Sequence, residues 1–165
     1  MKIEVKGLDR LLYGFERLGR SDEAEKTVNQ TLAQCAEGVR ARAVEILEEK
    51  VYSTPTPEGY TRTGQLKSAK NLTVEKIPNG HKVCTHLNYS VYIEFGTGTL
   101  GDPSVPHTTL RFWKSKKKGE GRWYTYHGMK PRPFLQPAFN EYKAKLPEIV
   151  KKKLARSLTE AMRNG

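Results

Sequence analysis

The clearest hydrophobic pattern lies in the first third of the chain. Between residues 22 and 50, apolar residues recur at steps of three and four, which places them on one face of an α-helix. They are Ala24, Val28, Leu32, Cys35, Val39, Ala43 and Ile46. Ser21 is suited to cap this helix, and acidic residues follow in the first turn, where the helix dipole favours them. We expect this long helix to be the structural backbone of the domain.

Two further helices are expected near the ends of the chain. A short strand around Ile3 and Val5 precedes a helical pattern over residues 8–18. Asn140 can cap a closing helix, whose apolar face holds Tyr142, Leu146, Ile149, Val150, Leu154, Leu158 and Met162. Pro147 removes a backbone donor there, so it is expected to kink this helix or to delay its start to Leu146.

The middle of the chain predicts strands. In residues 72–77 and 81–87, the side chains are expected to point alternately to the two faces of a strand. The Asn79-Gly80 pair between these segments favours a tight hairpin turn. In residues 89–98, Val91, Ile93 and Phe95 alternate with polar positions and lead into two glycines. This alternation indicates another extended segment with one face on the core.

Aromatic residues in 110–113 and 122–126 predict a second hairpin or long β-arm with a basic tip. Loops near 53–60 and 99–121 are rich in proline and glycine, and we expect them to be flexible. The predicted fold is therefore a single α+β domain over residues 1–165. It has a long N-terminal helix packed on an antiparallel sheet, an extended β-hairpin arm and a C-terminal helix.

Composition supports one domain, because 165 residues suit a single core. No apolar run reaches the ~18 residues that a membrane span needs, and the first residues lack an apolar signal core, so use in a cytoplasm is expected. Cys35 and Cys84 match no metal-binding spacing and are expected to be buried free thiols rather than a disulfide.

The net charge of +11 is concentrated in one region. Residues 111–132 hold eight Lys or Arg and one Asp or Glu, a local excess of +7. The candidate contacts for DNA or an acidic surface are Lys114, Lys116, Lys117, Lys118 and Arg122, which lie among aromatic residues. Lysines beside aromatic rings suit nucleic acid, although such charge runs are also common on solvated hairpin tips.

Signals for catalysis are weak. The chain has no P-loop, dinucleotide-binding or His-Glu-x-x-His pattern, and its four histidines are scattered, so we expect no enzyme activity, metal site or cofactor. Glu94 could act as an acid, or it could be a solvated or hydrogen-bonded side chain beside a turn. The second interpretation is favoured, because no histidine, nucleophile or second acid lies nearby in the sequence.

Three blocks together resemble one family. They are Thr63-Gly64-Gln65-Leu66-Lys67-Ser68, then residues 89–98 with Glu94-Phe95-Gly96-Thr97-Gly98, and then residues 128–139 with Arg132-Pro133-Phe134-Leu135-Gln136-Pro137-Ala138. Their order and spacing are similar to those of the gene-ten-type tail-component family of long-tailed bacteriophages and prophages. The resemblance covers most of the chain.

This resemblance implies a structural virion protein that completes the tail or joins it to the head. It implies a ring at the neck, commonly of six copies, that contacts the head connector and tail-tube or tail-terminator proteins. The expected interface residues are Glu94, Phe95, Gly96, Thr97, Gly98, Arg132, Pro133 and Phe134. The protein would lie in the virion neck or tail after assembly in the host cytoplasm, with no membrane contact and at most nonspecific contact with phage DNA.

The resemblance also implies that the hairpin strands provide subunit edges, that the glycines after Phe95 allow a close backbone approach, and that residues 131–137 form a rigid brace. The alternative function, from charge alone, is a basic nucleic-acid-binding module.

Overall fold

The computed structural model describes residues 2–4, 21–56, 61–105, 112–114, 123–125 and 128–163. The main elements are β1 (Lys2–Glu4), α2 (Ser21–Leu47), β2 (Leu72–Ile77), β3 (Gly80–Thr85), α3 (Ser90–Phe95), β4 (Phe112–Lys114), β5 (Trp123–Thr125) and α4 (Leu135–Arg163). Short helical turns cover Glu48–Tyr52, Gln65–Lys67 and Gly98–Leu100. The predicted α+β class is confirmed.

The predicted long helix is present as α2, which a π-helical turn extends to Tyr52. Its expected stripe faces the interior, because Val28, Leu32, Cys35, Val39, Ala43 and Ile46 are all buried. Both cysteines are buried and free, as predicted. The helix therefore has the role that its periodicity indicated.

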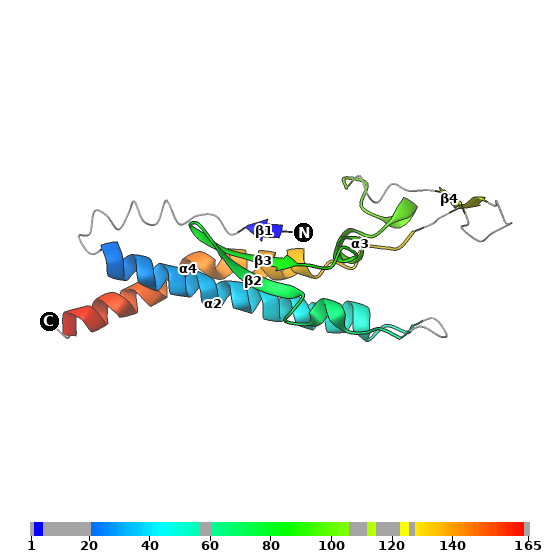
Figure 1. The fold of residues 1–165 in the computed structure, drawn as a ribbon. Coiled ribbons are helices and arrows are strands. Elements are labelled where there is room, and N and C mark those ends of the chain that lie inside the picture. The colour runs from blue at the N-terminus through cyan, green and yellow to red at the C-terminus, as the bar shows by residue number, and fades with distance from the viewer. Residues whose placement is uncertain are drawn as a thin grey trace.

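The closing helix differs from its prediction. It begins at Leu135, five residues before Asn140, and Pro147 lies inside it, so the expected delay to Leu146 is wrong. Pro137 falls in the first turn, where a missing backbone N–H has no intrahelical acceptor to lose. Helix α4 lies along α2 and runs antiparallel to it (Figure 1).

The contact between the two long helices is apolar at its centre and polar at its margins. Val28 and Leu32 pack against Val150 and Leu154, and all four side chains are buried. At one margin, Arg42 Nε donates to Glu141 Oε2 at 3.1 Å. The continued packing beyond Pro147 explains why α4 tolerates an interior proline, since buried contacts offset its cost of about 3 kcal/mol.

The hairpin is confirmed, and it is part of a three-stranded antiparallel sheet in the order β1-β3-β2. Ile77 pairs with Gly80, so the turn residues are Pro78 and Asn79 rather than the expected Asn79-Gly80 pair, and Asn79 has a positive φ of 63°. Proline followed by a left-handed residue fits a type II turn. Leu72 and Val83 join the core that α2 and the start of α4 complete, so the sheet packs on the long helix as predicted.

Residues 90–95 form a helix, and the predicted extended segment is wrong. The fully buried side chains are Ser90 and Glu94, four residues apart, whereas Val91, Ile93 and Phe95 are half-buried. The two buried positions are therefore spaced as in a helix, but both hold polar residues, so a hydropathy pattern does not detect them.

Strands β4 and β5 pair antiparallel, with Trp113 opposite Tyr124, in agreement with the predicted second hairpin. Figure 1 shows β4 away from the two long helices. The helix expected over residues 8–18, the loop tip at 57–60 and the segments 106–111 and 115–122 lie outside the described residues. In the described part of the chain, none of the helices combines the length and apolarity that a membrane span requires.

Candidate functional site

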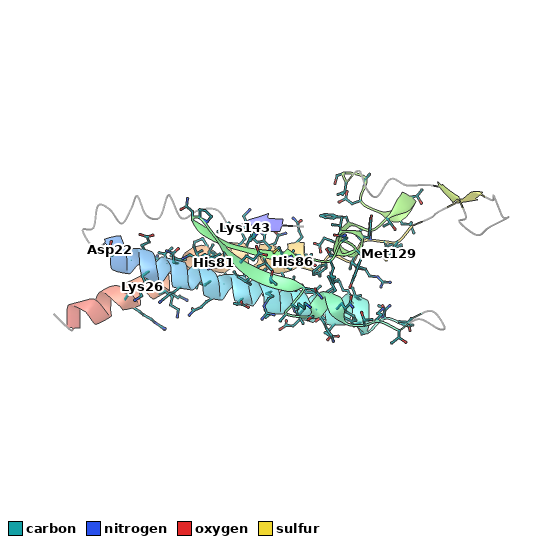
Figure 2. The ribbon with its side chains drawn as sticks, viewed as in Figure 1. Asp22, Lys26, His81, His86, Met129 and Lys143 are labelled. Carbon is teal, nitrogen blue, oxygen red and sulfur yellow. The ribbon has the colours of Figure 1, made fainter. Side chains whose placement is uncertain are left out.

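The three sequence blocks meet around one pocket at the carboxyl end of α2. Its volume is about 310 Å³. The lining residues are Val51, Tyr52, Arg62, Thr63, Gly64, Gln65, Leu66, Tyr89, Ile93, Met129 and Arg132. Each of the three blocks therefore provides part of the pocket lining. Met129, from the third block, lies beside α3 (Figure 2).

Glu94 connects two of the blocks from inside the fold. Its side chain is 1% exposed. One carboxylate oxygen, Oε2, accepts the backbone N–H groups of Phe134 and Leu135 at 2.8 and 3.0 Å, and Oε1 accepts that of Gln136 at 2.8 Å. These are the first amides of α4, which have no intrahelical acceptor. Glu94 thus caps α4 from a position some 40 residues earlier.

The hydrogen-bonded interpretation of Glu94 is the one that the structure supports. Both oxygens already accept backbone N–H groups, and the helix N-terminus stabilises their negative charge. The same contacts place the start of α4 against α3. The Arg132 backbone N–H donates to the Ile93 carbonyl oxygen at 2.8 Å, which holds Arg132 at the pocket.

Two glycines allow the backbones of the second and third blocks to approach closely. Thr97 and Met129 exchange backbone hydrogen bonds of 2.9 and 3.1 Å. A Cβ on Gly96 would lie 2.4 Å from the Met129 carbonyl oxygen, and one on Gly128 would lie 1.7 Å from that of Thr97. Both glycines also have positive φ angles, of 73° and 86°. The expected close backbone approach therefore occurs within one subunit.

Two arginines hold the segment that follows α2 against the pocket. Arg62 donates to the carbonyl oxygens of Tyr52 and Thr54 and, at 3.0 Å, to the Thr54 hydroxyl. Arg132 reaches the same hydroxyl at 3.3 Å. Because both guanidinium groups are only half-buried, they can bind this segment and still contact a ligand at the pocket.

The predicted interface residues are mostly internal. Glu94, Gly96, Thr97, Gly98 and Phe134 are buried, Phe95 and Pro133 are half-buried, and Arg132 lines the pocket. The expected brace at residues 131–137 is divided, because its last three residues form the first turn of α4. The large hydrophobic side chains that reach the surface among the described residues are Tyr89, Tyr92 and Leu100, which are 41%, 43% and 44% exposed.

No sequence pattern indicated a role for Tyr52, Arg62 or the outward side of α3. A helical interpretation of residues 90–95 would have revealed that side, because it separates Tyr89 and Tyr92 from the buried Glu94. Of the predicted basic contacts, Lys114 lies in β4, opposite Trp123. Lys116, Lys117, Lys118 and Arg122 lie outside the described residues, so a contact with DNA or an acidic surface stays a prediction.

Comparison with known proteins gives a family but no characterised relative. No curated protein and no solved structure matches the chain. The model of one family, described as YomN, matches residues 18–164, which include α2, the hairpin, all three blocks and α4. Because this match spans most of the chain, the protein belongs to the YomN family.

Proposed function

We propose that this protein is a structural virion subunit that completes a phage tail or joins the tail to the head. The resemblance of three separate blocks to tail components supports the proposal, and the name of the YomN family hints at a phage-associated origin. The function would be assembly rather than catalysis, with the subunits forming a ring at the neck.

The observation that carries the proposal is the convergence of the three blocks on one accessible pocket. Tyrosine, methionine and arginine are enriched at protein interfaces. The residues of these types that line the pocket are Tyr52, Tyr89, Met129, Arg62 and Arg132. Exposed Tyr92 and Leu100 add apolar surface in the same region of the chain. Such a pocket suits an apolar or acidic side chain of an adjoining virion protein.

Two further features suit ring formation. Among the described strands, β2 pairs with β3 on one side only, so its other edge has backbone groups that a neighbouring strand can use. The β4–β5 pair lies away from the long helices (Figure 1), where it can contact a second subunit. A ring, commonly of six copies, would bring these edges together between the head connector and the tail-tube or tail-terminator protein.

Binding to purified neck and tail proteins tests the proposal. The full chain is mixed with the connector, tail-tube and tail-terminator proteins of the same phage, and complexes are separated by size-exclusion chromatography at moderate salt. Replacing Tyr92 and Leu100 by Ser should weaken complex formation, because both side chains are exposed large hydrophobic groups. Lys152→Ser, at an exposed position of α4, is the matched control. Failure to bind any of these proteins would contradict the proposal.

The strong positive charge supports a second candidate, a basic nucleic-acid-binding module. The two candidates differ in their salt dependence. A DNA-binding protein should retard duplex DNA and lose affinity steeply with salt, with a log–log slope of about −0.9 for each phosphate contacted. An assembly subunit should keep its protein partners at a salt concentration that removes DNA.

A further inference from the structure

A cluster of metal-ligating side chains lies on the hairpin, away from the pocket. Glu75 in β2, Cys84 in β3 and His86 just after β3 bring their ligand atoms within 4.8 Å of one another. Figure 2 shows His86 at the end of β3. The core side chains Leu72 and Val83 belong to the opposite set of alternating positions, so this cluster lies on the face of the hairpin turned away from α2.

The register of the hairpin produces this arrangement. Thr73 pairs with Cys84, and Glu75 pairs with Lys82, so these four residues share one face of the two strands. His86 lies two residues beyond Cys84 and extends the same face. The sequence separations of nine and two residues match no linear metal motif, which is why spacing alone did not reveal the cluster.

Four donor atoms lie in one compact group, in which Cys84 Sγ and His86 Nε2 are within 4.8 Å of each other. Glu75 Oε1 lies 2.9 Å from Cys84 Sγ and 3.3 Å from His86 Nε2. The Thr73 hydroxyl completes the group, at 3.0 Å from His86 Nε2 and 3.4 Å from both Cys84 Sγ and Glu75 Oε1. Zinc bonds of 2.0–2.3 Å require tetrahedral edges of roughly 3.3–3.8 Å. To admit the ion, the 2.9 Å separation of Cys84 Sγ and Glu75 Oε1 would therefore have to lengthen by roughly 0.6 Å.

We propose that Glu75, Cys84 and His86 form a binding site for a divalent zinc ion, with the Thr73 hydroxyl at the fourth corner. Thiolate, imidazole and carboxylate together are a donor set that suits zinc, whereas calcium and magnesium prefer oxygen alone.

The surroundings of the cluster support this role. Lys82 Nζ lies 2.6 Å from Glu75 Oε2, the oxygen that does not face the thiol, so it orients the carboxylate as the outer partners of zinc ligands do. Cys84 is 3% exposed, whereas His86 is exposed and gives the ion a path from solvent.

Zinc binding at this site releases a proton. Without metal, Cys84 Sγ donates a hydrogen bond to Glu75 Oε1 at 2.9 Å, so the thiol carries a proton. On binding, the S–H bond breaks, a Zn–S bond forms, and the proton leaves to solvent. Zinc binding in a weakly buffered solution should therefore lower the pH of that solution.

Titration of the reduced, chelator-treated full chain tests the site. Zinc is titrated in competition with a chromophoric chelator, and cobalt is added separately to detect thiolate-to-metal charge-transfer absorption. We expect one ion per chain and a cobalt–thiolate band. Cys84→Ser and His86→Gln should each weaken zinc binding by at least ~100-fold and Glu75→Gln by ~10-fold or more, since even outer-shell losses cost roughly 10–100-fold.

Two variants serve as matched controls. Cys35→Ser removes the other thiol, which is buried in α2, and His81→Gln removes a histidine at an alternate position of β3. Both should retain wild-type affinity and the cobalt band. His86→Gln changes an exposed side chain, so it remains informative if Cys84→Ser does not fold. Absence of zinc binding, or unchanged affinity in the Cys84 and His86 variants, would overturn the site.

Discussion

Removal of the Glu94 carboxylate should destabilise the protein more than any exposed acidic substitution. Glu94 is 1% exposed and accepts three backbone N–H groups, those of Phe134, Leu135 and Gln136. Glu94→Gln keeps one oxygen but replaces the other by an NH₂ group, which faces backbone donors and cannot accept from them. It also removes the negative charge at the start of α4.

The expected loss can be worked from these contacts. A hydrogen bond to a charged group contributes about 1.5–3 kcal/mol, and a charge at a helix N-terminus up to ~2 kcal/mol, but the two terms overlap. We therefore expect Glu94→Gln to lower the free energy of unfolding by about 2 kcal/mol. Glu94→Ala also leaves the amides of two buried residues, Phe134 and Leu135, without an acceptor, so about 4 kcal/mol is expected.

Urea unfolding followed by circular dichroism measures these changes, with an unchanged m-value as evidence that the compactness of the two states is preserved. Glu148→Gln is the matched control, because Glu148 is an exposed glutamate of α4, and its effect should stay within about 0.5 kcal/mol. Hydrogen exchange should accelerate at the amides of residues 134–136 in the Glu94 variants. If Glu94→Gln costs no more than Glu148→Gln, the capping role is refuted.

Three further predictions concern the backbone, the acid response and the core. Gly96→Ala should lower the free energy of unfolding, measured in urea, by at least ~2 kcal/mol more than Gly64→Ala. Both glycines have a φ near 70°, but only a Cβ on Gly96 would clash with a carbonyl oxygen, at 2.4 Å. Equal costs would refute the close approach. The hydrogen bond from Cys84, followed by that from Lys82, lowers the pKa of Glu75 from 4.5 to about 2. The stabilising contribution of ionised Glu75 is therefore present above pH 4.5 and is lost as the pH falls toward about 2. The difference in thermal midpoint between wild type and Glu75→Gln should vanish over that range. A constant difference would contradict this prediction. Leu32 lies between the long helices, so Leu32→Ala should lower the free energy of unfolding by about 3 kcal/mol. Gln34→Ala, at an exposed position, should change it by no more than about 0.5 kcal/mol. Similar urea midpoints for both variants would refute the packing.

Hydrophobic patterns that extend over many residues predicted the fold well. The stripe from Val28 to Ile46 identified α2, and the alternation around Asn79-Gly80 identified the β2–β3 hairpin. Both signals extend over enough residues to establish a period. Residues 90–95 are too few for that, and their buried positions are occupied by Ser90 and Glu94, so their hydropathy suggested a strand.

The start of α4 was missed for a different reason. Local capping rules favoured Asn140, but the acceptor for the first amides is Glu94, some 40 residues earlier in the chain. The same nonlocal contact brings the second and third sequence blocks together, and Arg62 adds a pocket residue immediately before the first. Motif order therefore indicated which segments belong to the site, but only the fold shows that Glu94 and Phe134 are internal and that Tyr92 is exposed.

Native mass spectrometry of the full chain, alone and mixed with the tail-tube and connector proteins of the same phage, tests the proposed assembly role most directly. We expect a ring of several identical chains or a defined mixed complex, which the double Ser substitution at Tyr92 and Leu100 should weaken and Lys152→Ser should not. A chain that stays monomeric in every mixture, and binds duplex DNA in a salt-sensitive manner, would contradict the account and favour a nucleic-acid-binding module.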